Sequence, residues 1–129
     1  MRKSLSKKFL ERAKAFYEDA KIDFKNKKYD VAAFHLEQVA QFLIKAKLLE
    51  IFGDFPKTHD IRELLLILSK KFKKDEIEKF LKENSEGISL LIDSYITARY
   101  FFRDFTKNEV KKLFEIVEKL RKLLYERIF

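Results

Sequence analysis

The chain has 129 residues, a formal net charge of +8 and 47% hydrophobic residues, a balance that favours a folded domain over a disordered chain. It contains no cysteine, which excludes disulfides, thiol nucleophiles and cysteine-bound metal sites. Two glycines and one proline among many lysines, glutamates and leucines are typical of an all-helical protein. We therefore expect a single all-α domain over residues 1–129.

The sequence has no signal-peptide pattern and no stretch near the roughly 18 apolar residues of a membrane span, so we expect a soluble, cytoplasmic protein without a membrane partner. Many lysines and glutamates beside few asparagines and glutamines hint at a thermophilic source. The basic charge favours polyanionic partners, but lysines spread among acidic residues are also typical of a solvated surface. The fourteen phenylalanines predict an additional apolar surface, most simply a homodimer face.

Two helices are expected in the first half of the chain. Apolar residues three and four positions apart predict a helix over residues 6–25. Its apolar face comprises Phe9, Ala13, Phe16, Ala20, Ile22 and Phe24. A second helix runs from Tyr29 or Asp30 to Phe52, where Gly53 is expected as a left-handed C-cap and Pro56 prevents continuation.

The second half predicts three helices and a shorter helical piece. A helix starts at Asp60, with Glu63 in an arrangement similar to a capping box, and a short piece covers residues 75–82. After a break at residues 84–87, a helix spans residues 88–102. Thr106 and Glu109 form the capping box of a last helix that continues to the C-terminus. The apolar residues expected to face the core are Ile61, Leu64, Leu65, Leu68, Val110, Leu113, Val117, Leu120 and Leu124. Short loops predict an up-down antiparallel bundle of about five helices.

His35 is one of only two histidines. Helical spacing places it on one face with Val31, Val39 and Phe42, so it points into the core or an interface. One interpretation is a buried histidine held by hydrogen bonds to a tyrosine or carboxylate of a neighbouring helix. The other is a polar pocket that His35 shares with Gln38 on the next turn.

His59 lies immediately before the third expected helix. With Lys57 and Thr58 it could hold a phosphate, because free backbone N–H groups at a helix N-terminus attract anions. Asp60 is expected to occupy that end as the cap and would repel an anion. The alternative is that His59 belongs to a cap and turn that fix the entry to the helix.

Tyr95, Arg99 and Arg103 are four residues apart and share one face of the helix over residues 88–102. Arg99 could hold a phosphate through bidentate contacts, or it could form an internal network with Asp93 or Glu37. The sequence has no glycine-rich phosphate loop, no His-Glu-x-x-His and no repeated Glu-x-x-His. We therefore expect neither a cofactor nor a metal.

Three motifs in chain order resemble a known family. The first is a second helix rich in His and Gln that ends in Lys-Ala, the next a Pro-x-Thr-His-Asp turn, and the last a Tyr-x-x-x-Arg-Tyr. They comprise His35, Gln38, Ala40, Lys45 and Ala46; Pro56, Thr58, His59, Asp60, Leu64 and Leu65; and Tyr95, Arg99 and Tyr100. Together they resemble the HEPN family of small helical domains associated with minimal nucleotidyltransferases, and the resemblance runs from the first helix to the last.

The resemblance implies a dimer and, in active members, a metal-independent endoribonuclease. The ribonuclease motif is an Arg, a polar residue and then a His four to six positions after the Arg. Arg99 matches the Arg, but no His follows in RYFFRDFTKNEV, so general acid–base cleavage lacks its base. We therefore favour a non-catalytic protein.

The leading interpretation is a nucleotide- or RNA-binding module that pairs with a nucleotidyltransferase in a toxin–antitoxin-like system. The residues that the resemblance assigns to the ligand site are His35, Gln38, Lys45, His59, Tyr95 and Arg99. One alternative is an endoribonuclease that uses Arg99 with a displaced His. The other is a helical scaffold that binds no ligand.

Overall fold

The computed structural model describes the backbone of residues 2–100 and 104–125 and the side chains of residues 4–96 and 104–125. This part of the chain forms six α-helices and no strand, so the predicted all-α class is confirmed. The helices are α1 (Arg2–Lys25), α2 (Tyr29–Phe52), α3 (Ile61–Ser69), α4 (Lys74–Glu83), α5 (Ser85–Tyr100) and α6 (Lys107–Leu124). None of them has the length and apolar character needed to cross a membrane within the described residues.

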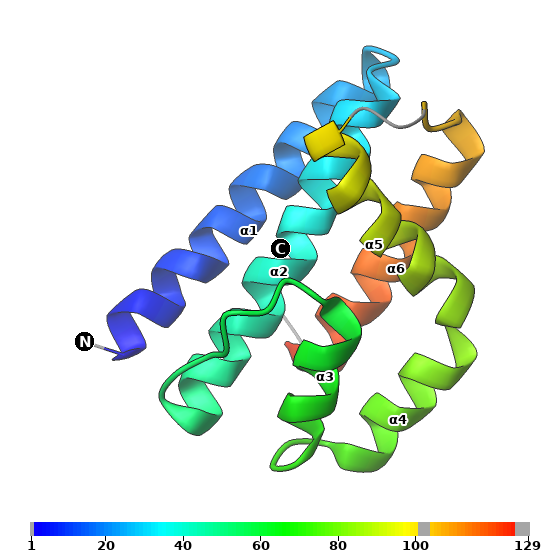
Figure 1. The fold of residues 1–129 in the computed structure, drawn as a ribbon. Helices are drawn as coiled ribbons and strands as arrows, with labels where there is room; N and C mark the ends of the chain where they lie inside the picture. Colours follow the sequence, from blue (N-terminus) through cyan, green and yellow to red (C-terminus); the bar gives the residue numbers. More distant parts are fainter. Residues whose placement is uncertain (1, 101–103, 126–129) are drawn as a thin grey trace.

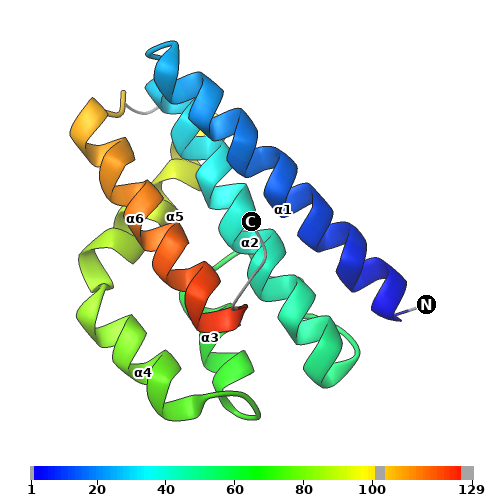
Figure 2. The same ribbon diagram turned by 180° about the vertical axis from the view of Figure 1, so that it is seen from behind.

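Helix α2 is the centre of the bundle. It forms a long antiparallel hairpin with α1 and also contacts α3, α5 and α6 (Figure 1). Seen from behind, α6 lies beside α2 on the side away from α1 (Figure 2). The short α4 bridges α3 and α5 at the edge of the bundle. Because α2 has neighbours around most of its circumference, two of its polar side chains, Glu37 and Gln41, are buried.

The helix ends follow local sequence signals. Gly53 has φ 80° and its N–H bonds to the Leu49 carbonyl, which confirms the predicted left-handed C-cap. Thr106 and Glu109 form the predicted capping box, each side chain accepting from the other's backbone N–H. Helix caps of this kind depend only on contacts within about one helical turn, so the sequence predicts them well.

The start of α3 differs from the predicted capping box. Asp60 is the N-cap and accepts from the N–H groups of Arg62 and Glu63. The Glu63 side chain, however, accepts from the Thr58 hydroxyl, and that hydroxyl accepts from the N–H of Asp60. In a capping box the Glu63 side chain would accept from the N–H of Asp60. Here the Thr58 hydroxyl accepts that hydrogen bond instead, because the turn before α3 folds back over the first residues of the helix.

The break predicted at residues 84–87 is wrong in extent. Only Asn84 interrupts the helices, and α5 begins at Ser85 rather than at Ile88. Helix α1 likewise begins at Arg2, four residues before its predicted start. The last helix ends at Leu124, where Tyr125 is extended, and residues 126–129 lie outside the described part.

The core is one cluster of buried side chains with contributions from all six helices. All the core residues expected on α3 and α6 are buried, as are Ala13 and Ala20 of α1. Ile22 and Val31 were expected on buried faces, but they are 58% and 43% exposed. Both residues lie near the turn between α1 and α2. The two helices extend past the neighbouring helices there, so the spacing of apolar residues no longer predicts which of them are buried.

Candidate ligand-binding site

A polar cluster lies inside the bundle around Glu37 of α2. The Glu37 side chain is fully buried and accepts from two amide nitrogens, Nε2 of Gln38 at 2.7 Å and Nε2 of Gln41 at 2.8 Å. The same Gln41 nitrogen donates to the His59 carbonyl at 2.6 Å. The cluster therefore links α2 to the segment that enters α3.

Burial changes the ionisation of this cluster. It raises the pKa of Glu37 to about 7, although the two glutamine amides and Lys45 act in the opposite direction. Burial also lowers the pKa of Lys45, and the attraction of Glu37 partly offsets that effect. A buried carboxyl and a half-buried ammonium thus influence each other electrostatically, and the carboxyl changes charge near neutral pH.

His59 and Tyr95 meet at the edge of the cluster. Their rings stack with centroids 5.2 Å apart and an interplanar angle of 21°. This contact joins the segment before α3 to α5, two elements that are far apart in the sequence. Asp60 already binds the first N–H groups of α3, so the anion site predicted there has a carboxylate cap beside it.

His35 lies in a different environment, against α1. Its Nδ1 is 2.6 Å from Oδ2 of Asp23, and its ring stacks on Phe16 with centroids 5.4 Å apart. The His35 side chain is 20% exposed. These contacts match the interpretation of a histidine held by a carboxylate of a neighbouring helix.

The predicted polar face of α5 is described only in part. The side chain of Tyr95 is half-buried and contacts His59. Arg99 follows it by one turn on the helical backbone, but its side chain lies outside the described residues, as does the whole of Arg103.

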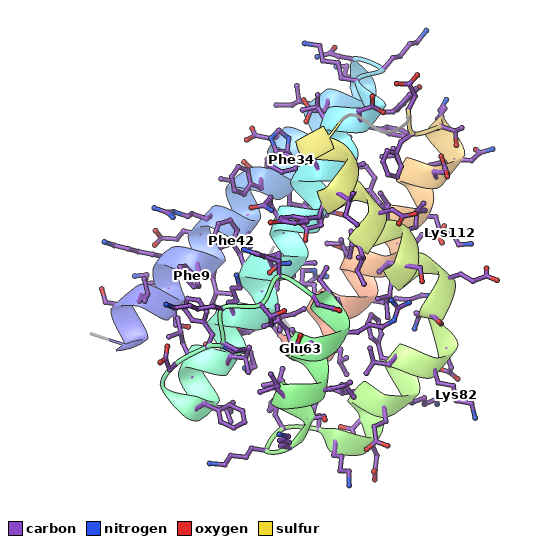
Figure 3. All side chains as sticks on the ribbon, in the orientation of Figure 1. Phe9, Phe34, Phe42, Glu63, Lys82 and Lys112 are labelled. Carbon is purple, nitrogen blue, oxygen red and sulfur yellow. The ribbon has the colours of Figure 1, made fainter. Side chains whose placement is uncertain are left out.

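A row of half-exposed aromatic rings runs along the α1–α2 hairpin beside the polar cluster. Phe16 stacks on Phe42 with centroids 5.6 Å apart, and Phe9 contacts both Phe42 and Phe55 at 5.5 and 5.6 Å. In Figure 3, Phe9, Phe34 and Phe42 lie on the same face of the hairpin. Such rings can stack with planar ligands.

One line of side chains on α2 borders both the aromatic row and the polar cluster. We call it the α2 stripe; it consists of Phe34, Gln38, Phe42 and Lys45, which are four, four and three positions apart and are all half-buried. The Lys45 ammonium lies 5.4 Å from the centroid of Phe55. The stripe thus offers two aromatic rings, an amide and a cation within three turns of one helix.

Four of the six predicted ligand residues therefore lie in or next to one cluster: Gln38, Lys45, His59 and Tyr95. His35 stands apart on Asp23. Sequence reasoning missed Gln41 entirely and did not recognise Glu37 as the centre. The signal was present, because Glu37, Gln41 and Lys45 are polar residues four apart on an otherwise apolar helix.

The chemistry that the described residues offer is binding by hydrogen bonds, stacking and charge. They include no group of three or more histidine, aspartate or glutamate side chains that could hold a metal ion. Gln41 Oε1 is buried and has no hydrogen-bond partner among these residues. The arrangement suits a planar ligand with a negative charge.

An all-α bundle around a long central helix pair, with buried polar side chains on the central helix, defines a class of small helical domains. A family model of the HEPN domain matches residues 6–128, nearly the whole chain. The chain belongs to the HEPN domain family. A comparison with curated proteins gives no match.

Proposed function

We propose that this HEPN-domain protein is a non-catalytic, dimeric module that binds nucleotide or RNA along the α2 stripe. We further propose that it acts with a nucleotidyltransferase in a toxin–antitoxin-like pair. The observation that supports the proposal is the convergence of Gln38, Lys45, His59 and Tyr95 from three separate segments on one cluster.

The α2 stripe has a suitable group for the base and for the phosphate of a nucleotide. Phe34 offers a ring face for a base, and stacking of a base on an aromatic side chain is worth about 1–3 kcal/mol. Lys45 offers a cation for a phosphate. We assign Arg99 to a second phosphate contact, since α5 brings its backbone within one turn of Tyr95.

His35 has a different role in this proposal. Its Nδ1 is bound to Asp23 and its ring stacks on Phe16, so it fixes the aromatic row next to the ligand. Only the exposed edge of its ring is left for a ligand. We therefore expect it to contribute less to affinity than Lys45.

The binding proposal is tested by calorimetric titration with adenosine 5′-monophosphate and with a short, labelled single-stranded RNA. Lys45→Met should weaken binding of both about tenfold, because it removes a charge-assisted contact to phosphate. Lys71→Met is a matched control. The Lys71 ammonium lies 5.1 Å from the ring centroid of Phe52, which is the last residue of α2 and is not part of the α2 stripe. Equal losses in the two variants would indicate unspecific attraction to a basic surface and contradict the proposal.

The partner is tested by the neighbouring reading frame and its product. If a minimal nucleotidyltransferase is encoded there, the two purified proteins should form a complex in calorimetry or gel filtration. Failure to bind both the nucleotidyltransferase and the two nucleic-acid ligands would leave the ligand-free scaffold as the better interpretation. In that case the polar cluster would serve only the fold.

The geometry also favours one version of the alternative endoribonuclease. His59 stacks on Tyr95, which precedes Arg99 by one turn, so His59 is the histidine best placed to replace the missing one. RNA incubated with the native protein should then be cleaved, and Arg99→Ala and His59→Ala should each abolish cleavage. Cleavage that survives both substitutions would point to a contaminant.

A further inference from the structure

The orientation of the Gln38 amide is determined by Glu37. Nε2 of Gln38 donates to Oε1 of Glu37 at 2.7 Å, which places the amide nitrogen on the side of the carboxyl. The other carboxylate oxygen is used by Gln41. Because the amide nitrogen is used in this bond, the carbonyl oxygen is the atom that Gln38 can offer to a ligand.

Gln41 cannot take over this outward position. Its Nε2 donates to Glu37 and also to the His59 carbonyl, which fixes its amide from two sides inside the bundle. Gln38 is only half-buried and carries a single such bond. Of the two glutamines, Gln38 is thus the one that can present an acceptor to a ligand.

The position of Gln38 on the α2 stripe determines which part of a bound nucleotide its side chain would contact. Phe34 lies one turn before it and Phe42 one turn after it, and both are half-buried. A base stacked on Phe34 would turn its polar edge along the helix towards Gln38, whereas Phe42 already stacks on Phe16 and contacts Phe9. Lys45 lies two turns beyond Gln38 on the same stripe.

On the basis of the nucleotide binding proposed above, we propose that Gln38 selects bases that carry an exocyclic amino group. Its outward Oε1 accepts a hydrogen bond from that group, as in adenine or cytosine. Glu37 is the positioning residue that keeps this oxygen outward. A base without the amino group leaves the Gln38 oxygen unpaired in a partly enclosed site, and such a loss discriminates between ligands.

The first experiment compares adenosine 5′-monophosphate with purine riboside 5′-monophosphate, which lacks only the 6-amino group. The native protein should bind the adenine nucleotide roughly 2- to 10-fold more tightly, the value of one hydrogen bond. Equal affinities overturn the selection by Gln38 and leave nucleotide binding intact. Absence of binding for both nucleotides overturns the proposed function itself, and this inference with it.

The second experiment uses two variants to separate selection from fold. Gln38→Met keeps the length of the side chain without an acceptor, so the preference for the adenine nucleotide should disappear while the purine riboside affinity changes little. Glu37→Gln lets the Gln38 amide turn either way, so the preference should be reduced by the loss of positioning alone. A preference that persists in both variants contradicts the proposal. The ratio of affinities in the native protein remains decisive if a variant does not fold.

A second copy of the chain is the competing occupant of the α2 stripe. The side-chain amide signals of Gln38 in nitrogen-15 NMR spectra of the native protein distinguish this occupant from a nucleotide. Adenosine 5′-monophosphate should shift these signals in a concentration-dependent manner. Signals that respond to dilution of the protein and not to the nucleotide would assign the stripe to a protein interface and overturn the proposal.

Discussion

Glu37 is a fully buried carboxyl whose two oxygens accept hydrogen bonds from glutamine amides. Its pKa in the folded protein is about 7, above the ordinary value of 4.5, because burial penalises the charged form. The fold therefore binds this proton more tightly than the unfolded chain does. The stabilisation is fully present below about pH 4.5 and is lost as the pH rises through about 7.

This shift predicts a pH-dependent free energy of unfolding that can be traced to one residue. A shift from 4.5 to about 7 corresponds to a stability difference on the order of 3 kcal/mol. Glu37→Gln cannot titrate, so its free energy of unfolding should fall less than that of the native protein between pH 5 and pH 8. Urea unfolding of both proteins across this range measures the effect. Parallel pH profiles would contradict the burial of Glu37.

The same residue shows where prediction from sequence stops. The helical face drawn through His35, Val39 and Phe42 points at α1, and the sequence gives no reason to prefer it over the face that carries Glu37. Which face is enclosed depends on α3 and α5, whose docking on α2 is a tertiary property. The stack of His59 on Tyr95 depends on that docking as well.

At the scale of the helix, Gly87 is a position where α5 and α6 approach each other closely. It lies in the first turn of α5, is buried, and has no room for a side chain. A methyl group at this position would clash with Cγ1 and Cδ1 of Ile116 in α6. From the sequence we expected Gly87 to belong to a break between helices, because glycine near Asn84 and Ser85 is typical of a loop. The structure uses it instead for helix packing.

Substitution of Gly87 tests this packing. In an exposed helix, Gly→Ala is stabilising by about 1 kcal/mol, but here we expect Gly87→Ala to destabilise the fold by about 1–3 kcal/mol, because Ile116 must move. Ile116→Ala removes the two contacting atoms, so the cost of Gly87→Ala should be much smaller in that background. Chemical denaturation of the four proteins measures this coupling. Equal costs in both backgrounds would show that α5 and α6 are further apart.

For the whole molecule, composition and periodicity were sufficient to predict the all-α class and the order of the helices. Both rest on local physics, namely the spacing of apolar residues and the chemistry of caps such as Gly53 and Thr106. The polar cluster was only partly predictable, since it assembles from α2, α5 and the segment before α3. The homodimer predicted from the fourteen phenylalanines stays a prediction.

Salt separates the two interactions proposed for the whole molecule. A dimer held by aromatic and aliphatic side chains is insensitive to ionic strength, whereas RNA bound by a protein of net charge +8 releases counterions and weakens steeply as salt rises. Raising the salt from about 0.1 to 0.5 M should therefore leave the molecular mass measured by sedimentation equilibrium at the dimer value, twice the 15.6 kDa of one chain. Over the same range the affinity for single-stranded RNA should fall at least tenfold. If the dimer dissociates as salt rises, the basic surface belongs to the protein–protein contact. If the RNA affinity does not change with salt, phosphate recognition by Lys45 is removed from the proposed function.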